Sequence, residues 1–501
     1  MQRKRLVPCQ GITVAFCWLF QAPAALLVQL HSGAMRINQC LTGARNSNAL
    51  YRHKSHDKVL EPYIFLLALL ARLVVFFLAV SGFFLVGEGQ VQANLAENIA
   101  SGRGFMLSES MFHDSDPRRD ASLEFFRETG GFYGVLLPEK PTSFFVPGFP
   151  LFEAFIFAVA GMGNLTAVVG VQLVLGLLTV FLGMRIASRF VSGWWYTAAG
   201  VFIALDPFEL YFQAVPATQA LFSLLFIAGL LFSIRFLENT RIANGVVAGL
   251  VWGITFIVRP VAFPMVVWLA AVVLIAGKFA VKRLPSILVM LFSFAVVLAP
   301  WVLRNRNTMG RYQLLPLQGG VQMWEYNGRI FTDAFLGEAE GATLLYGPVR
   351  QVWLPRLNQA ELAEFPVFTT ETEFQRDSIL YSRQISFLKA NPLVFLHLSA
   401  CRFAEFFKPF PLNSFSPVHT ILGLLSFFWI GVFFFAGMHL MVRMGWQGVY
   451  TAGVTAGYIL MHLLTASGTP HRVALDIPLA IASLVAMKYS FERFKTGKLP
   501  S

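Results

Sequence analysis

Charged residues are scarce in this 501-residue chain. They make up 13% of the sequence, whereas 56% of the residues are hydrophobic and 51 are Phe. A soluble protein of this length needs more polar surface, so the composition excludes that class. Apolar runs of about 20 residues recur, and each is long enough to cross the roughly 30 Å hydrocarbon core of a bilayer. The sequence therefore predicts an all-α polytopic membrane protein.

Cysteine and acidic residues are also few. Three of the four Cys lie in the first 40 residues, which argues against a disulfide framework or a cysteine-based metal site. The 39 Lys and Arg outnumber the 27 Asp and Glu. These basic residues are dispersed in short loops between apolar runs, which is the positive-inside pattern rather than a nucleic-acid footprint. We expect membrane lipids as neighbours, no nucleic-acid partner and no cofactor.

The first 61 residues do not fit the rest of the chain. Residues 1–5 are basic and 11–30 are apolar, as in a signal peptide or an extra span. A span would place five basic residues outside and invert every later loop, and a cleaved signal peptide meets the same conflict. We expect a non-spanning or dispensable extension, with Met35 as a plausible later start.

The positions of Lys and Arg indicate which of the remaining loops face the cytoplasm. Two apolar stretches, 148–162 and 392–407, would break the charge pattern if either crossed alone, so we expect helices on or dipping into the outer surface. Two large segments, 87–164 and 304–418, then face outside. The body extends over 62–490, and 491–501 form a basic cytoplasmic tail. The ten predicted crossings are 62–86, 165–185, 193–207, 211–235, 244–259, 261–277, 285–303, 419–441, 448–465 and 472–489.

Every turn assigned to the cytoplasm is basic in this arrangement. The residues concerned are Arg185, Arg189, Arg235, Arg241, Lys278, Lys282, Arg283 and Arg443. The pattern predicts an integral protein of a bacterial cytoplasmic membrane, with its polar chemistry on the outer, periplasmic face.

An acid begins the first outer segment. Apolar residues repeat at i, i+4 and i+8 from Val91 to Ile99, so we predict an amphipathic helix that Glu88 begins and Gly102 or Gly104 ends. A helix N-terminus favours an ionised carboxylate, whereas nearby hydrocarbon disfavours it. These opposing effects suit Glu88 to a role as a base. The alternative is that Glu88 caps the helix and faces water.

Other polar residues gather on the same predicted face. Asp114 and Asp116 resemble a metal-binding Asp-x-Asp, but a solvated loop explains them as well, and we expect no metal. Short outer turns contribute Asp206-Pro207, Arg259-Pro260 and His471-Arg472. Long loops are the usual carriers of function, so this gathering favours a functional site.

The motifs form an ordered set. They are an acid after the first span, an Ala-x-Asn helix, Gly102-Arg103-Gly104-Phe105, Pro141-Thr142, Pro147-Gly148-Phe149-Pro150, an outer Asp-Pro, an Arg-Pro after a span, and Pro300-Trp301-x-x-Arg304-Asn305. The set resembles the membrane glycosyltransferases of the GT-C type, which include protein O-mannosyltransferases and bacterial aminoarabinose transferases. The resemblance covers roughly 62–490.

The resemblance implies transfer of a sugar from a polyprenyl-phosphate donor to a lipid, glycan or protein acceptor at the outer face. In this family an acid of the first outer loop acts as catalytic base or positions the acceptor, and Glu88 occupies that place, where relatives more often have Asp. Gln219 stands where many relatives carry a carboxylate. His471-Arg472 stand where many have Arg-Tyr.

The reaction needs a base for the acceptor hydroxyl and cations for the departing phosphate. Arg forms paired hydrogen bonds with phosphate oxygens, which strengthen in the low dielectric near lipid. The candidates for the donor phosphate are Arg259, Arg304, Arg103, Lys140 and Arg472. The candidates for sugar or acceptor contacts are Asp114, Asp116, Trp324 and His471.

Several of these residues have simpler explanations. Arg304 follows a span, where basic side chains commonly extend to lipid headgroups. Arg259 lies between two short spans with no loop to solvate it, which favours function. We expect Trp301 to face lipid or to anchor the chain at the membrane interface.

Two other classes of function stay open. A transporter or lipid flippase is also polytopic, but more often shows paired sequence halves, which are not apparent here. A non-catalytic membrane scaffold is the third possibility.

Overall fold

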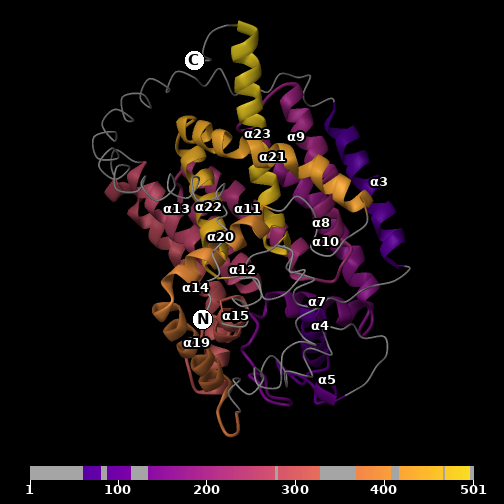
Figure 1. Cartoon of the computed structure of the whole chain (residues 1–501), viewed down its shortest axis with the longest axis vertical. Coiled ribbons are helices and arrows are strands. Elements are labelled where there is room, and N and C mark those ends of the chain that lie inside the picture. Colours follow the sequence, from indigo (N-terminus) through magenta and orange to yellow (C-terminus); the bar gives the residue numbers. More distant parts are fainter. Residues whose placement is uncertain are drawn as a thin grey trace, which may run out of the picture. The chain divides into compact units, whose positions relative to one another are not determined.

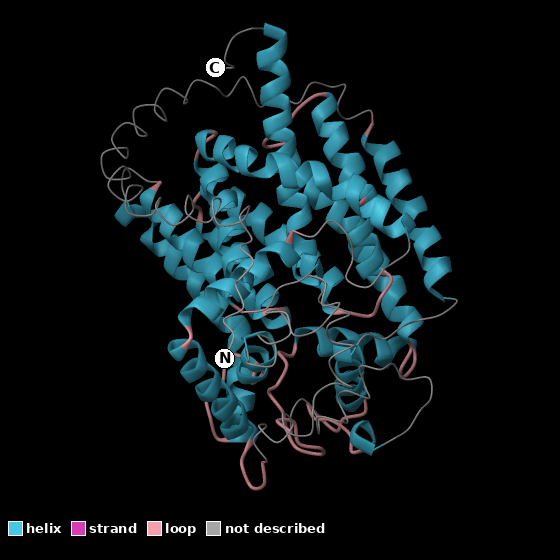
Figure 2. Ribbon diagram, viewed as in Figure 1, coloured by secondary structure: helices cyan, strands magenta, loops and turns pink. Residues whose placement is uncertain are grey.

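The computed structural model describes residues 60–80, 87–113, 134–276, 280–327, 368–407, 417–465 and 469–496. The N-terminal extension up to residue 59, Asp114 and Asp116 lie outside the described residues. Figure 2 shows that the described residues form helices joined by loops, and their β-type pairing is limited to one isolated bridge between Met106 and Pro141. The all-α expectation is confirmed for this part of the chain.

Six of the described helices are long and apolar enough to cross a membrane. The chain is therefore an integral, polytopic membrane protein. These helices are α3 (Glu61–Val80), α8 (Leu165–Ala187), α11 (Thr218–Glu238), α14 (Ala280–Met309), α21 (Pro417–Arg443) and α23 (Thr469–Thr496).

Shorter helices occupy the remaining predicted crossings. They are α9 (Trp194–Leu205), α12 (Ile242–Val258), α13 (Phe263–Ile275) and α22 (Trp446–Leu464). The two stretches predicted to form surface helices are also helical, as α7 (Gly148–Ala160) and α20 (Pro392–Phe406).

One predicted boundary between spans differs from the structure. α9 has 12 residues, a length of about 18 Å, and a second short helix, α10 (Pro207–Gln213), follows it. The Asp206 side chain accepts a hydrogen bond from the Phe208 N–H at 3.1 Å, and Pro207 begins α10 because its missing N–H costs nothing there. α11 consequently starts at Thr218 rather than near residue 211.

α12 and α14 pack at backbone distance along a stripe of glycines. A Cβ added at Gly249 would lie 2.1 Å from the Met290 carbonyl oxygen, and one at Gly245 would lie 2.7 Å from that of Ser286. These glycines are one helical turn apart, so they line one face of α12. Small residues at this spacing allow two membrane helices to approach closely.

The outer segments add α4 (Gly87–Ala100), α5 (Ser110–His113), α15 (Gly319–Asn327) and α19 (Glu373–Ala390). These helices and α7 gather at the end of the bundle away from the C-terminal end of α23 (Figure 1). Trp301, which we expected to face lipid or to anchor the chain at the membrane interface, is only 7% exposed and packs edge-on against Phe105 with ring centroids 5.1 Å apart. The lipid-facing alternative was wrong because the outer segment covers this end of α14.

Candidate functional site

α4 begins and ends where the sequence predicts. Glu88 lies in its first turn and is exposed. After Ala100 the chain turns through Gly102 and Gly104, with φ of 80° and 94°, and the N–H groups of Arg103 and Gly104 donate to the Asn98 carbonyl. Positive φ favours glycine, which explains the Gly-Arg-Gly motif.

The asparagine of the Ala-x-Asn motif holds the turn that follows α4. Asn98 is fully buried, and its Nδ2 donates to the Met106 carbonyl at 2.6 Å. Its Oδ1 accepts from the Ser108 hydroxyl at 3.2 Å. These bonds fold the chain back along α4, so the motif residue has a structural role.

Arg304 connects three parts of the outer face. Its Nη1 donates to the Thr142 carbonyl at 2.7 Å and to Asn305 Oδ1 at 2.9 Å. Its Nη2 donates to the Phe105 carbonyl at 3.0 Å. Three motifs therefore meet at one guanidinium group, and these contacts favour a structural role for Arg304 over the predicted role in phosphate binding.

A carboxylate that the sequence analysis did not single out lies beside this junction. Glu373, the first residue of α19, is 4% exposed, and its Oε1 accepts from the Ser143 N–H at 3.0 Å. Burial raises the pKa of Glu373 to about 7, although hydrogen bonds from Thr142 and Ser143 and the charge of Arg304 act in the opposite direction. A capping box in the sequence marks the start of α19, but it does not indicate that Glu373 is buried.

Arg103 and Lys140 are both exposed. They lie near the two sides of the bridge that pairs Met106 with Pro141. Arg103 Nε donates to the Ser101 hydroxyl at 3.3 Å. Both predicted phosphate ligands therefore lie on the surface of the first outer segment.

The Pro-Gly-Phe-Pro motif places α7 against the end of α12. A Cβ at Gly148 would lie 2.5 Å from the Ile257 carbonyl oxygen, two residues before Arg259. Only glycine allows this approach. α4 packs in turn against α7 through buried residues that include Ala96, Ala154 and Phe157. The first outer segment is thus anchored beside Arg259.

Arg259 ends α12 and is half-buried. Its Nε and Nη2 both donate to the Thr218 hydroxyl, at 3.0 and 2.8 Å, and its guanidinium lies 5.4 Å from the ring centroid of Phe222. Tyr458 and His471 lie within its electrostatic range. We call these five residues the Arg259 group. No carboxylate among the described residues forms an ion pair with Arg259.

α22 and α23 complete the Arg259 group. Tyr458 Oη donates to the His471 carbonyl at 2.7 Å, and the rings of His471 and His462 are 4.7 Å apart. Two of the predicted site residues, Arg259 and His471, are therefore neighbours. Residues of four helices that are far apart in sequence, α11, α12, α22 and α23, therefore meet here.

Arg472 directly follows His471 but has different surroundings. It is 0% exposed, and its Nε donates to Asp476 Oδ1 at 2.9 Å. Its Nη1 donates to the Phe406 carbonyl at 3.0 Å, and its guanidinium lies 3.5 Å from the ring centroid of Phe427. This enclosure favours a structural role over the predicted contact with the donor phosphate.

Arg472 and Asp476 belong to a larger group of buried charges. Asp206 interacts electrostatically with Asp476, Glu209 and Arg472, and Arg72 interacts with both Asp206 and Glu209. Arg72 Nη1 also donates to the Ala204 carbonyl at 3.1 Å. We call these five residues the buried charge network, and each is at most 2% exposed.

The sequence analysis did not single out Arg72, Glu209 or Asp476. Arg72 and Asp476 lie inside the predicted crossings 62–86 and 472–489. A charge inside an apolar run is expensive and therefore informative, and this signal could have identified both residues.

The second outer segment is fixed to α22 by another arginine. Arg402, on α20, donates to Asn327 Oδ1 at 2.7 Å and to the Leu463 carbonyl at 2.6 Å. Trp324 lies one turn before Asn327 on α15 and is half-buried against the core of the outer segments. Its predicted sugar contact stays a prediction.

The described residues contain no group of three His, Cys, Asp or Glu that could hold a metal ion. Asp114 and Asp116 lie outside the described residues, so their predicted contacts are not tested. The division of the chain into an extension, a body and a tail also stays a prediction.

No protein-family model matches the chain, and no curated protein matches it. Solved structures match most of its length. The archaeal oligosaccharyltransferase AglB from Archaeoglobus fulgidus, in complex with an inhibitory peptide and a dolichol-phosphate, has a TM-score of 0.49 and 11% identity over 89% of this chain and 53% of its own. ArnT from Cupriavidus metallidurans bound to undecaprenyl phosphate has a TM-score of 0.35 and 13% identity over 86% and 78%. The chain is similar, at low sequence identity, to GT-C glycosyltransferases of known structure.

Proposed function

We propose that the protein transfers a sugar from a polyprenyl-phosphate-linked donor to a lipid, glycan or protein acceptor at the outer face of a bacterial cytoplasmic membrane. The observation that carries the proposal is the state of Arg259. It is a half-buried cation at the end of the bundle where the outer segments gather, with no carboxylate partner among the described residues. A cation in this setting is suited to an anionic ligand.

The proposed topology has ten crossings, and α9 and α10 together form one of them. Contacts between helix ends support it. Arg185 and Glu61 form an ion pair at 3.4 Å, and Arg189 pairs with Glu238. Gln447 also donates to Glu238, at 2.9 Å. These contacts join α3, α8, α11 and α22 at the end away from Arg259, and the basic residues there favour a cytoplasmic location.

Arg259 is the proposed ligand of the donor phosphate. Its Nε and Nη2 share one hydroxyl acceptor, which orients the guanidinium plane. His471, a half-buried neighbour of Arg259, is the proposed contact with phosphate or sugar. Tyr458 is fully buried and holds the His471 carbonyl in place. As the bond between the anomeric carbon and the phosphate oxygen breaks, negative charge grows on the phosphate, and the fixed positive charge of Arg259 stabilises it.

Glu88 is the proposed base. The acceptor hydroxyl oxygen forms the new bond to the anomeric carbon, its proton passes to the carboxylate, and polyprenyl phosphate departs. Glu88 is exposed on α4, which packs against α7, and α7 contacts the residues before Arg259. Arg103 and Lys140, exposed on the same segment, are proposed to assist at the lipid phosphate.

Membranes containing the full chain should transfer radiolabel from one of several polyprenyl-phosphate sugars to lipid, glycan or protein. Glu88→Gln should lower transfer by about 100-fold or more, the usual contribution of a general base. Arg259→Ala should lower it strongly, and Arg259→Lys should restore part of the rate. Arg306→Ala is the matched control, since Arg306 is an exposed arginine on α14. Unchanged transfer by Glu88→Gln would remove that residue from the mechanism, and no transfer from any donor would contradict the proposal.

The buried charge network supports a transporter as the second candidate. Charges enclosed within spans are typical of ion and substrate pathways, and α9 and α10 form a broken helix at Asp206. Sealed vesicles distinguish the two functions. A transporter would accumulate the labelled sugar lipid or its sugar without forming a covalent product, whereas the proposed enzyme yields a new glycoside.

A further inference from the structure

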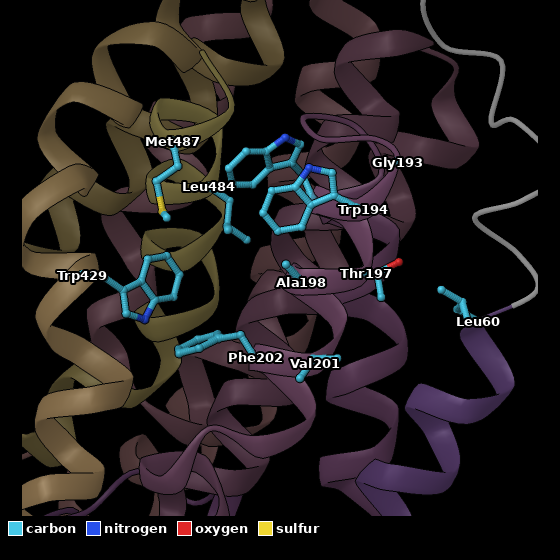
Figure 3. A pocket seen from close by; sticks show the side chains of 11 residues that line it. Leu60, Gly193, Trp194, Thr197, Ala198, Val201, Phe202, Trp429, Leu484 and Met487 are labelled. Carbon is cyan, nitrogen blue, oxygen red and sulfur yellow. The ribbon is translucent and has the colours of Figure 1, made fainter. Parts of the chain in front are cut away.

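A cavity lies at the N-terminal end of α9, the end away from Asp206. Its volume is about 840 Å³, and residues of α9, α21 and α23 form most of its walls. Figure 3 shows Trp429 on one side, Trp194 on the other and Phe202 below them. Phe202 and Trp429 pack edge-on with ring centroids 5.3 Å apart. The walls are therefore bulky, stiff and apolar, as in a site for a hydrocarbon chain.

The cavity opens toward the outside of the bundle. Trp194 is 59% exposed and Leu60 is 43% exposed, and both line it. Because these residues lie at the ends of membrane helices, the surroundings are the interfacial region of one leaflet. Tryptophan is enriched at this depth, where its ring meets hydrocarbon and its N–H meets polar groups. Acyl chains therefore have direct access to the cavity.

The mouth of the cavity also carries positive charge. Gly193, which lines the cavity, is the N-cap of α9, so the positive end of the α9 dipole lies at the mouth. Lys488 follows Met487 of the cavity wall, and its Nζ donates to the Ser192 hydroxyl at 3.3 Å. Glu492 lies 3.9 Å from the same Nζ; both side chains are partly exposed, so solvent screens this pair. A helix N-terminus and an ammonium group together favour phosphate.

We propose that this cavity binds an anionic glycerophospholipid of the adjacent leaflet. One acyl chain would lie between α9 and α21, and the phosphate would lie between the start of α9 and Lys488. A free phosphate ion would use only the mouth and a neutral lipid mainly the apolar walls, whereas an anionic lipid uses both. The site is distinct from the Arg259 group and from the buried charge network, since no residue of either lines the cavity.

The test uses the full chain in vesicles that contain photoreactive phosphatidylglycerol or photoreactive phosphatidylcholine. Cross-links from phosphatidylglycerol should map to 194–202 and to the peptide around Trp429, with a lower yield from phosphatidylcholine. Lys488→Ala should lower the phosphatidylglycerol yield about fivefold, the effect of one basic residue near a charged membrane surface. Ala198→Trp should lower it at least as much, because the indole fills the cavity that Ala198 lines.

Two variants serve as matched controls. Lys495→Ala removes a lysine from the exposed last turn of the same helix, and Val174→Trp adds a tryptophan at a 56% exposed position of α8. Both should leave the cross-linking yield unchanged. Lys488→Ala keeps the cavity intact, so it stays informative if Ala198→Trp does not fold.

Three outcomes would overturn the proposal. The first is an equal yield from the two lipids, which removes the preference for anionic headgroups. The second is a yield that Lys488→Ala and Lys495→Ala lower equally. The third is an absence of lipid cross-links at 194–202. None of these depends on whether the protein transfers sugars.

Discussion

Arg259 and Arg472 both lie at turns that the sequence predicts to face outside, yet the structure gives them opposite surroundings. Arg259 is half-buried, and its guanidinium bonds to the Thr218 hydroxyl. Arg472 is fully buried and bonds to a carboxylate and a backbone carbonyl. An arginine whose charge is already neutralised within the protein offers little to a ligand, whereas one without a carboxylate partner retains its attraction for anions.

The contrast extends to the groups around each arginine. The buried charge network holds three carboxylates and two guanidinium groups with almost no exposure. The Arg259 group adds a tyrosine, a threonine and a histidine but no carboxylate. We therefore expect the network to stabilise the fold and the Arg259 group to bind substrate. The following variants test that division, from the largest expected effect on stability to the smallest.

Arg472→Ala should destabilise the protein by about 3–5 kcal/mol, because it leaves the Asp476 carboxylate buried without its partner. Thermal unfolding in detergent measures this effect. The double variant Arg472→Ala/Asp476→Ala should lose less than the sum of the single variants, since it strands no charge. An Arg472→Ala variant as stable as Arg259→Ala would show that the two arginines contribute equally to stability.

Glu373→Gln should change how stability depends on pH. The pKa of Glu373 is raised to about 7 from an ordinary value of 4.5, so folding favours its protonated form. That contribution is fully present below about pH 4.5 and is lost as the pH rises through 7, with a size on the order of 3 kcal/mol. The variant should flatten this slope in urea unfolding measured between pH 4.5 and 7.5. Glu109→Gln, at an exposed carboxylate of the first outer segment, is the control. An unchanged slope in Glu373→Gln would contradict the prediction.

Gly148→Ala should cost about 1–3 kcal/mol, because its Cβ would lie 2.5 Å from the Ile257 carbonyl oxygen. The variant also displaces the chain beside Arg259, so sugar transfer should fall without any change of charge. Gly457→Ala is the control, since a Cβ there meets nothing within 4 Å. Full transfer activity in Gly148→Ala would show that the Pro-Gly-Phe-Pro motif does not position the Arg259 group.

Arg259→Ala should have the smallest effect on stability, about 1 kcal/mol, because it removes hydrogen bonds to the Thr218 hydroxyl and strands no carboxylate. Its effect on sugar transfer should be large. Parallel unfolding and transfer assays on one preparation measure both. A loss of stability as large as that of Arg472→Ala would assign Arg259 a structural role instead.

Much of the fold could be predicted from the chain alone. Each predicted crossing contains a helix, and the helix at Glu88 ends at the expected glycines. The turn at Asp206-Pro207 was predicted, but the short helix α10 and the start of α11 at Thr218 were missed, because an apolar run does not reveal where a buried aspartate caps a new helix. Trp301 was misplaced because its covering residues, such as Phe105, are distant in sequence.

The candidate site was predicted less completely. The expected neighbours Arg259 and His471 do meet, but the roles of Arg304 and Arg472 depend on partners that no local pattern indicates. Glu373 was missed for the same reason, since its partner Ser143 is 230 residues away.

The sequence by itself determined that this is a helical, polytopic membrane protein with polar residues concentrated in the segments between its apolar runs. Length, hydropathy and charge order along the chain suffice for that, because bilayer thickness and backbone hydrogen bonding impose local requirements. Only the tertiary structure decided which of those polar residues are enclosed and neutralised and which are available to a ligand. Burial and pairing depend on atoms brought together through space, so Arg259 and Arg472, alike in sequence position, differ in what they can do.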